Sequence, residues 1–429
     1  MQNRKERLRM LIEEYWRNDI PVAIERDIDI DLSSRFIVDI VGPRRAGKTY
    51  LMYLTIRKLL EEGVSKKNTI YINFERRILY PLTPEYFNDL VEIIYEEGIE
   101  GKIYLFLDEV QRVNEWEKFV RSIYDEFGSR IKIFVSGSTS KLTSSAMSTL
   151  LTGRHITRIV LPLSFREFLR FRNYEVPEVP VESDIVKIKK LLNEYIEYGG
   201  FPEVVLMKRK EEYIETLFQD IVLRDVAPRV SNPLVLEDIA YFLTSMAGRL
   251  LSFSKVVKLL KARGIKISVP TLEKYFYFLK DAFLFFDTRI YSYRIRDQLQ
   301  YPRKIYCVDT GFVNYFGFKF SEDRGRMLEN LVALELLRRG KKIFYWKDQR
   351  GREVDFVVVK GSKVDELIQV SYDVSDPDTL KREVDAIQIA SAELKCKKKT
   401  VITWDYEENG EIRFVPLWKW LLERYAVKH

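Results

Sequence analysis

Residues 36–49 read Phe-Ile-Val-Asp-Ile-Val-Gly-Pro-Arg-Arg-Ala-Gly-Lys-Thr, and this stretch decides the fold. Its first six residues are an apolar run rich in branched side chains, which indicates a strand, and the apolar spacing of Tyr50 to Glu61 is helical. The turn between them, Gly42-Pro43-Arg44-Arg45-Ala46-Gly47-Lys48-Thr49, has the pattern Gly-x-x-x-x-Gly-Lys-Thr. Glycines there let the backbone close around phosphates, so that its N–H groups and the following helix N-terminus bind the anion. The flanking strand and helix favour a phosphate-binding loop over a fortuitous Gly-rich turn.

The loop also predicts its ligands. Lys48 is expected to reach the β and γ phosphates of a nucleotide, and Thr49 is expected to supply a hydroxyl to magnesium. We therefore expect ATP or ADP with Mg²⁺, bound by the eight residues from Gly42 to Thr49.

A second motif lies further along the chain, in Tyr104-Leu105-Phe106-Leu107-Asp108-Glu109. Four apolar strand residues end in two carboxylates, which places Asp108 at the carboxyl edge of the sheet beside the loop. Asp108 is then expected to hold the magnesium shell, and Glu109 to polarise the attacking water as general base. The alternative is an acidic pair that begins a surface turn.

Two further residues are candidates for the catalytic site. The segment Phe134-Val135-Ser136-Gly137-Ser138-Thr139-Ser140 ends an apolar run in hydroxyls, and we choose Ser138 as the side chain that senses the γ phosphate or positions water. Ser and Thr are also ordinary turn and N-cap residues. Arg154 is a candidate arginine finger, with a plain surface arginine as the alternative.

The wider pattern predicts an α/β fold. Apolar runs alternate with helical stretches up to residue 160, which indicates a parallel, doubly wound sheet buried on both faces. Beyond it we expect a mostly helical lid, three helices with a hairpin typical of a winged helix-turn-helix, and a second α/β domain. The predicted domains are residues 1–160, 161–236, 237–300 and 301–429.

Composition excludes several classes of protein. Hydrophobic residues at 46% argue against a disordered chain, and two cysteines with two histidines cannot make a disulfide framework or a Cys/His zinc site. No secretion signal or membrane span is predicted, so we expect a cytoplasmic protein. The net charge of +7, from 71 basic and 64 acidic residues, is only a hint of a nucleic-acid partner.

Several segments together resemble a known family. They are the loop, Leu107-Asp108-Glu109-Val110-Gln111-Arg112, Leu161-Pro162-Leu163-Ser164-Phe165-Arg166-Glu167-Phe168 and Tyr198-Gly199-Gly200-Phe201-Pro202-Glu203. Their order is similar to that of archaeal and bacterial AAA-type P-loop ATPases with a C-terminal domain of unknown function, DUF4143. The resemblance implies an AAA-like core, a helical lid, a winged helix and a restriction-endonuclease-like terminal domain. It also implies that Gly200 to Glu203, including Pro202, lies near the adenine or the lid hinge.

The predicted winged helix suggests DNA as a partner. Its second helix would expose Thr271, Lys274 and Lys280 to the major groove, with Lys255 and Lys258 near phosphates. The aromatic run Tyr275-Phe276-Tyr277-Phe278 favours the alternative, packing between domains.

In the terminal domain, Glu329, Asp355 and Gln369 follow the order of restriction-endonuclease-like catalytic residues. A hydrolytic site of that kind needs carboxylates that converge on magnesium and a lysine two residues after the last ligand. Here Gln369 is neutral and Ser371 stands where the lysine is needed. We therefore expect a degenerate site that binds and does not cut.

Two functions follow from these patterns. In the first, ATP hydrolysis drives a conformational cycle that is reported to a macromolecular partner, with DNA as the first candidate. In the second, bound nucleotide sets the conformation of a slow switch or scaffold for a protein partner.

Overall fold

The computed structural model describes residues 3–138, 153–317 and 324–423. The chain divides into two compact units, Met1–Val160 and Leu161–His429. Within the described residues, no helix has both the length and the apolar character needed to cross a bilayer.

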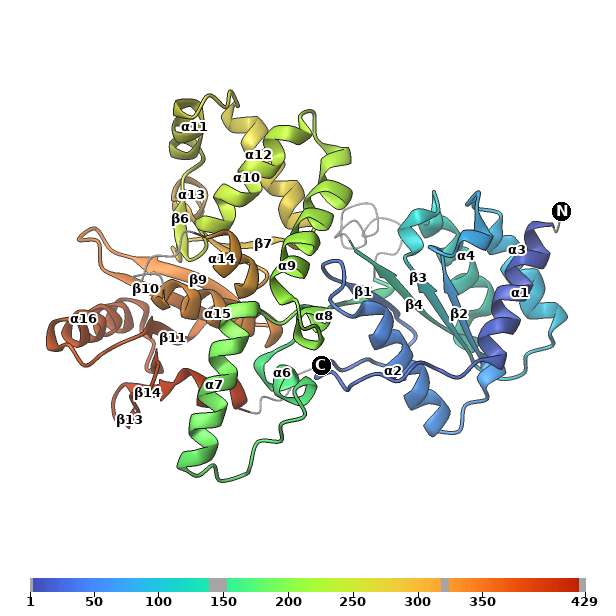
Figure 1. Ribbon diagram of the computed structural model, residues 1–429, viewed down its shortest axis with the longest axis horizontal. Helices are drawn as coiled ribbons and strands as arrows, with labels where there is room; N and C mark the ends of the chain where they lie inside the picture. The colour runs from blue at the N-terminus through green and yellow to red at the C-terminus, as the bar shows by residue number, and fades with distance from the viewer. Residues whose placement is uncertain (1–2, 139–152, 318–323, 424–429) are drawn as a thin grey trace. The chain divides into compact units, whose positions relative to one another are not determined.

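The first unit contains a five-stranded parallel sheet with the strand order β2-β3-β4-β1-β5 (Figure 1). The strands are β1 Ile37–Val41, β2 Thr69–Asn73, β3 Ile103–Asp108, β4 Ile131–Gly137 and β5 His155–Ile159. The extra strand β4 lies between β1, which leads into the loop, and β3, which ends in the two carboxylates. Because all strands are parallel, both features reach the same edge of the sheet. The predicted α/β core with a parallel P-loop sheet is confirmed.

Helices cover this sheet as the apolar spacing predicts. They are α1 Arg4–Arg17, α2 Lys48–Glu61, α3 Tyr86–Glu96 and α4 Trp116–Phe127, with 3-10 turns at Lys66–Asn68, Arg77–Leu79, Val110–Arg112 and Gly128–Arg130. Leu51 and Ile56 of α2 pack on Val38 and Phe134 of the sheet. Burial of this apolar stripe fixes α2, and with it the helix N-terminus at the loop.

The second unit begins with helices. They are α6 Phe165–Phe171, α7 Glu182–Tyr198, α8 Pro202–Leu206 and α9 Lys210–Gln219, followed by a π-helical stretch Asp220–Val226 and a 3-10 turn Ala227–Arg229. Ser164 and Glu167 form a reciprocal capping box that starts α6. A loop separates α6 from α7.

The next segment has the order helix, strand, helix, helix, strand, strand. Its elements are α10 Pro233–Ser245, β6 Arg249–Leu251, α11 Phe253–Ala262, α12 Val269–Asp281, β7 Phe285–Thr288 and β8 Arg303–Cys307. The three strands form an antiparallel sheet in the order β6-β8-β7. Ser268 caps α12, because its hydroxyl accepts from the Thr271 N–H. A short helix, α13 Ile295–Gln300, lies between β7 and β8.

The chain then builds a six-stranded mixed sheet in the order β13-β14-β12-β11-β10-β9 (Figure 1). Its strands are β9 Lys342–Lys347, β10 Glu353–Lys360, β11 Lys363–Ser371, β12 Lys399–Thr403, β13 Glu408–Asn409 and β14 Arg413–Pro416, and the helices are α14 Thr310–Phe316, α15 Arg324–Arg338, α16 Pro377–Leu394 and α17 Leu417–Leu422. Strands β9, β10 and β11 are an antiparallel meander, and β12 runs parallel to β11. The parallel crossover between β11 and β12 is made by α16.

Hydrophobic clusters cross the predicted subdivisions of this second unit. Ile188 and Leu192 of α7 belong to the same cluster as Phe356 of β10 and Trp418 of α17. Residues of the predicted lid therefore contribute to the core of the terminal sheet. The boundaries at residues 236 and 300 stay predictions.

Candidate functional site

The loop after β1 needs glycine at two positions, Gly42 and Gly47. A Cβ on Gly42 would lie 2.1 Å from the carbonyl oxygen of Val160, and Gly47, which caps α2, has a φ of 100°. Arg45 also has a positive φ, of 62°. Alternation of such conformations turns successive N–H groups inward and forms an anion-binding concavity. The local backbone thus fits a phosphate group.

Lys48 lies inside this loop. Its Nζ donates to the carbonyl oxygens of Gly42 at 3.1 Å and Pro43 at 2.9 Å, and the side chain is buried at the first turn of α2. An ammonium held there places a positive charge beside the N–H groups of the loop. Charge and N–H donors together suit a polyphosphate.

The carboxylate of Asp108, fully buried at the end of β3, is joined directly to the loop. The hydroxyl of Thr49 donates to its Oδ2 at 2.7 Å, and the hydroxyl of Tyr71 donates to the same oxygen at 2.8 Å. Ser136 donates to the other oxygen, Oδ1. The Thr49 hydroxyl and the Asp108 carboxylate are therefore in contact, and they are the two predicted magnesium ligands. Hydroxyl and carboxylate oxygens are the ligands that Mg²⁺ prefers, so this pair fits the ion.

Glu109 follows in a left-handed backbone conformation, with a φ of 55°. Its N–H donates to Ser136 Oγ at 3.1 Å, and Gln111 Nε2 donates to its Oε2 at 2.6 Å. Burial raises the pKa of Glu109, the charge of Lys48 opposes that rise, and Asp108 adds to it. A raised pKa makes the carboxylate a stronger base.

Sequence reasoning chose Ser138 and missed the hydroxyl that contacts the carboxylates. Ser138 is buried just beyond β4, whereas Ser136 bridges Asp108 and Glu109. Tyr71 and Asn73 of β2 were also missed, although the register pairs Asn73 with Asp108. Their signal was available, because the polar residue that ends a parallel strand lies at the same edge as its neighbours. Thr139 and Ser140 lie outside the described residues.

Arg154 is not brought to the loop. It directly precedes β5, and its carbonyl accepts from the Ile37 N–H at the amino end of β1. The loop follows the opposite end, which is about 16 Å away for a five-residue strand. The guanidinium lies 3.8 Å from Asp125. The geometry therefore excludes a direct contact with phosphate in the same chain, and an arginine-finger role would need a second copy.

The motif around Pro202 has a clear structural role within the second unit. Gly199 and Gly200 pack so closely that a Cβ would lie 1.5 Å from Asp309 Oδ1 and 2.5 Å from the Leu163 carbonyl, respectively. The Gly200 N–H donates to Asp309 Oδ2 at 2.8 Å. Pro202 then begins α8 at its first position, where proline is favoured. That Pro202 lies near the adenine or the lid hinge stays a prediction.

Asp309 predicts a pH dependence of stability. Burial raises its pKa to about 7, although the Gly200 and Gly311 N–H groups oppose the rise. The pKa of this carboxyl is higher in the folded protein than in the unfolded chain, where it is 3.8. Its contribution to the free energy of unfolding is therefore complete below pH 3.8 and is lost as the pH rises through about 7. The loss is at most about 4 kcal/mol.

We expect Asp309→Asn, which cannot ionise, to flatten this dependence. Thermal unfolding of both proteins at pH 5, 6, 7 and 8 measures the effect. The wild-type midpoint falls more steeply than that of the variant. Parallel curves would show that Asp309 does not change its protonation on unfolding over this range.

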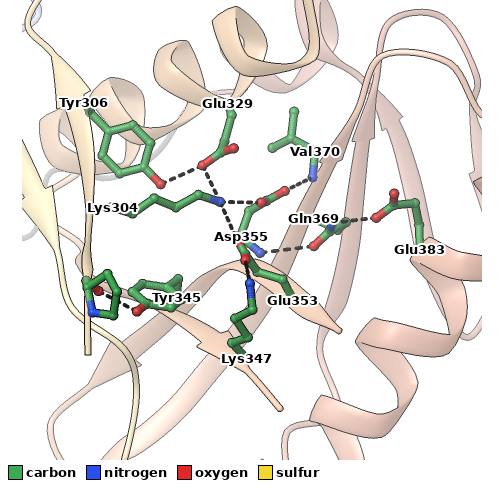
Figure 2. A network of polar contacts seen from close by, with 11 residues as sticks. Lys304, Tyr306, Glu329, Tyr345, Lys347, Glu353, Asp355, Gln369, Val370 and Glu383 are labelled. Atoms are coloured by element: carbon green, nitrogen blue, oxygen red, sulfur yellow. Dashed lines mark hydrogen bonds and ion pairs between the residues drawn. The ribbon is translucent and has the colours of Figure 1, made fainter. Parts of the chain in front are cut away.

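A second polar cluster lies in the second unit (Figure 2). Glu329 of α15 and Asp355 of β10 are brought together, as predicted, and Gln369 of β11 accepts from the Asp355 N–H at 3.1 Å. The sequence did not indicate Lys304 of β8, whose Nζ lies 2.8 Å from both carboxylates. The Gln369 amide donates onward to Glu383 at 2.5 Å. The Ser371 hydroxyl donates to the nearby Asp373 carbonyl oxygen.

The chain is similar to several known proteins and protein families. An AAA domain matches residues 34–169, and two domains of unknown function, DUF8612 and DUF4143, match residues 189–323 and 324–420. The chain is 35% identical to the uncharacterized protein MJ1544 of Methanocaldococcus jannaschii, over 96% of each chain. It is 32% identical to an uncharacterized protein of Haemophilus influenzae, over 90% of this chain and 94% of that one. Among solved structures, the Walker-type ATPase PABY2304 of Pyrococcus abyssi is similar, with 17% identity, a TM-score of 0.39, and coverage of 73% of this chain and 94% of that one.

Proposed function

Because the chain belongs to the family of AAA-type P-loop ATPases with a C-terminal DUF4143 domain, we propose that it binds ATP with Mg²⁺ in the loop from Gly42 to Thr49 and hydrolyses it. The observation that carries this proposal is the 2.7 Å hydrogen bond from the Thr49 hydroxyl to Asp108 Oδ2. It joins the loop to the strand whose next residue is Glu109. Phosphate binding, metal binding and a base are then adjacent, as phosphoryl transfer to water requires.

Each residue has a distinct part in the proposed reaction. Lys48 and the loop N–H groups bind and orient the β and γ phosphates, and Thr49 and Asp108 hold the metal. Bound Mg²⁺ supplies charge stabilisation at the phosphate oxygens. Glu109 accepts a proton from the attacking water, and Gln111 and Ser136 fix its position through the side-chain and main-chain hydrogen bonds described above.

Three further residues complete the proposed nucleotide site. Ser138, buried at the end of β4, is proposed to sense the γ phosphate from the same edge of the sheet. Arg154 is proposed to act only on nucleotide bound by another copy of the chain. Pro202 is proposed to lie near the adenine or the lid hinge.

We further propose that the segment from α10 to β8 is a winged helix that binds DNA phosphates. The order of its helices and strands supports this assignment, as does its charge. Between Phe253 and Tyr275 six residues are basic and only Glu273 is acidic. Lys255, Lys258 and Lys274 are exposed.

The aromatic residues Tyr275 to Phe278 of α12 differ in their exposure. Tyr275 and Phe276 are buried in the cluster that holds this segment together, whereas Tyr277 is 55% exposed. The helix thus uses one face for packing and leaves Lys274 and Tyr277 accessible. Lys280 is less available than predicted, because it is paired with Asp287.

Salt dependence tests the DNA proposal. Phosphate binding releases counterions, so affinity measured by fluorescence anisotropy should fall as salt rises. Replacing Lys255, Lys258 and Lys274 with alanine should lower the slope of log affinity against log salt by up to about 3. The matched control replaces the exposed Lys58, Lys67 and Lys118 of the first unit and should leave the slope unchanged. Absence of binding at low salt, with ATP, ADP or neither, would remove DNA as a partner.

The rate of hydrolysis separates this function from a slow nucleotide-dependent switch for a protein partner. Stimulation of ATP turnover by DNA supports a DNA-coupled cycle. Slow turnover that DNA does not change supports the switch.

For the terminal domain we propose a restriction-endonuclease-like fold that does not cut DNA. Support comes from the helix, meander, helix and parallel strand made by α15, β9, β10, β11, α16 and β12. The neutral Gln369 and the locally bonded Ser371 weaken any hydrolytic site. We expect no cleavage of linear, nicked, single-stranded or branched DNA with Mg²⁺ or Mn²⁺. Metal-dependent cutting that disappears in Asp355→Ala would overturn this proposal.

A further inference from the structure

The ammonium of Lys304 lies at the centre of a buried group of carboxylates. Its Nζ is 2.8 Å from Glu329 Oε1, 2.8 Å from Glu353 Oε1 and 2.8 Å from Asp355 Oδ1. The lysine side chain is only 4% exposed. Figure 2 shows the three acidic side chains pointing toward this one nitrogen.

These groups come from different parts of the second unit. Lys304 is on β8, which belongs to the small sheet with β6 and β7, whereas Glu329 is on α15 and Asp355 on β10. Tyr306, two residues further along β8, donates its hydroxyl to the same Glu329 oxygen at 2.7 Å. The cluster therefore fastens one face of β8 to a helix and a strand of the terminal domain.

An ammonium in this position takes the volume that a metal ion would need. Ca²⁺ binds carboxylate oxygens at about 2.3–2.6 Å, close to the three Nζ distances here. Buried carboxylates need a positive charge nearby, because water no longer solvates them. Lys304 contacts all three of them, and Lys347 adds a second positive charge at Glu353, 3.1 Å from its Oε2.

We propose that Lys304 is an internal replacement for a divalent cation, so that the nuclease-like carboxylate cluster is permanently filled and works as a clasp between β8 and the terminal domain. The cluster in the wild-type protein then binds no divalent metal. Removing the lysine side chain converts it into a metal site.

The protonation of the cluster agrees with this inference. Burial lowers the pKa of Lys304, but the surrounding carboxylates outweigh this effect and raise the pKa well above its usual value. Burial and the neighbouring Asp355 raise the pKa of Glu329 to about 8, against the effect of Lys304. The lysine therefore stays charged.

The test compares Lys304→Ala with Lys304→Met in the full chain, without nucleotide. Alanine opens the space of the ammonium, whereas methionine removes the charge but still fills much of the volume. Both variants should unfold at a lower temperature than the wild type in EDTA. Saturating Ca²⁺ should raise the midpoint of Lys304→Ala by about 5 °C and leave Lys304→Met and the wild type unchanged.

A double variant keeps the test decisive if Lys304→Ala folds poorly. The double variant Lys304→Ala/Asp355→Asn removes the negative charge of Asp355 together with the positive charge of Lys304. It should therefore be more stable than Lys304→Ala in EDTA. It should not be stabilised by Ca²⁺, because one carboxylate ligand is missing. The proposal is wrong if the double variant is no more stable than the single one. It is equally wrong if folded Lys304→Ala gains no Ca²⁺ site, or if wild-type protein shows a Ca²⁺ site that Asp355→Asn abolishes.

Discussion

Glu109→Gln is expected to bind ATP with nearly wild-type affinity and to hydrolyse it at least about 100-fold more slowly. The substitution keeps the size of the side chain and its ability to accept from Gln111, but glutamine cannot take a proton from water. The hydrogen bonds from Lys48 to the Gly42 and Pro43 carbonyl oxygens and from Thr49 to Asp108 do not include Glu109, so the phosphate and metal ligands are retained. The effect should therefore be confined to the chemical step.

Steady-state phosphate release and equilibrium binding of a fluorescent ATP analogue measure the two quantities separately. The matched control is Glu115→Gln, an exposed carboxylate six positions further along, which should change neither. Turnover at the wild-type rate in Glu109→Gln would mean that another group activates the water.

Lys48→Ala is expected to weaken nucleotide binding by about 100-fold or more. Two charge-assisted hydrogen bonds to phosphate, each of about 1.5–3 kcal/mol, would be lost, and every 1.4 kcal/mol is a factor of ten. The Gly42 and Pro43 carbonyl oxygens would also lose the donor that holds the loop. Hydrolysis should fall with binding, since unbound ATP is not positioned.

Titration calorimetry with ATP and with ADP, both in Mg²⁺, measures this loss. Lys58→Ala is a suitable control, because Lys58 is exposed on the same helix and its removal changes the net charge equally. Unaltered affinity in Lys48→Ala would show that the nucleotide binds elsewhere.

The parallel core was predictable because its signals are local. An apolar run, a Gly-rich turn and a helical stretch follow one another in the chain, and two carboxylates end another apolar run. Parallel strands bring such ends together whatever the loops between them do, so Thr49 and Asp108 meet as expected. Ser136 and Asn73 were predictable by the same reasoning from the strand register, whereas the role of Ser138 stays a prediction.

Other parts depended on contacts that the sequence does not encode locally. Lys304 and Asp355 are 51 positions apart and belong to different sheets, so no spacing rule connects them. Asp309 meets Gly200 across 109 positions, so the packing of this motif within the second unit could not be read from the sequence. The separation of Arg154 from the loop of its own chain has a simpler reason. A residue that precedes a parallel strand lies at the opposite edge from the loop.

The most direct test of the account is a single-turnover experiment with trace radiolabelled ATP, Mg²⁺ and excess protein. We predict that the wild type converts bound ATP to ADP, that Glu109→Gln retains bound ATP unhydrolysed, and that Lys48→Ala retains no nucleotide. The three proteins then separate binding at the loop from chemistry at the end of β3. Conversion in Glu109→Gln at the wild-type rate, or undiminished binding in Lys48→Ala, would contradict the proposed site.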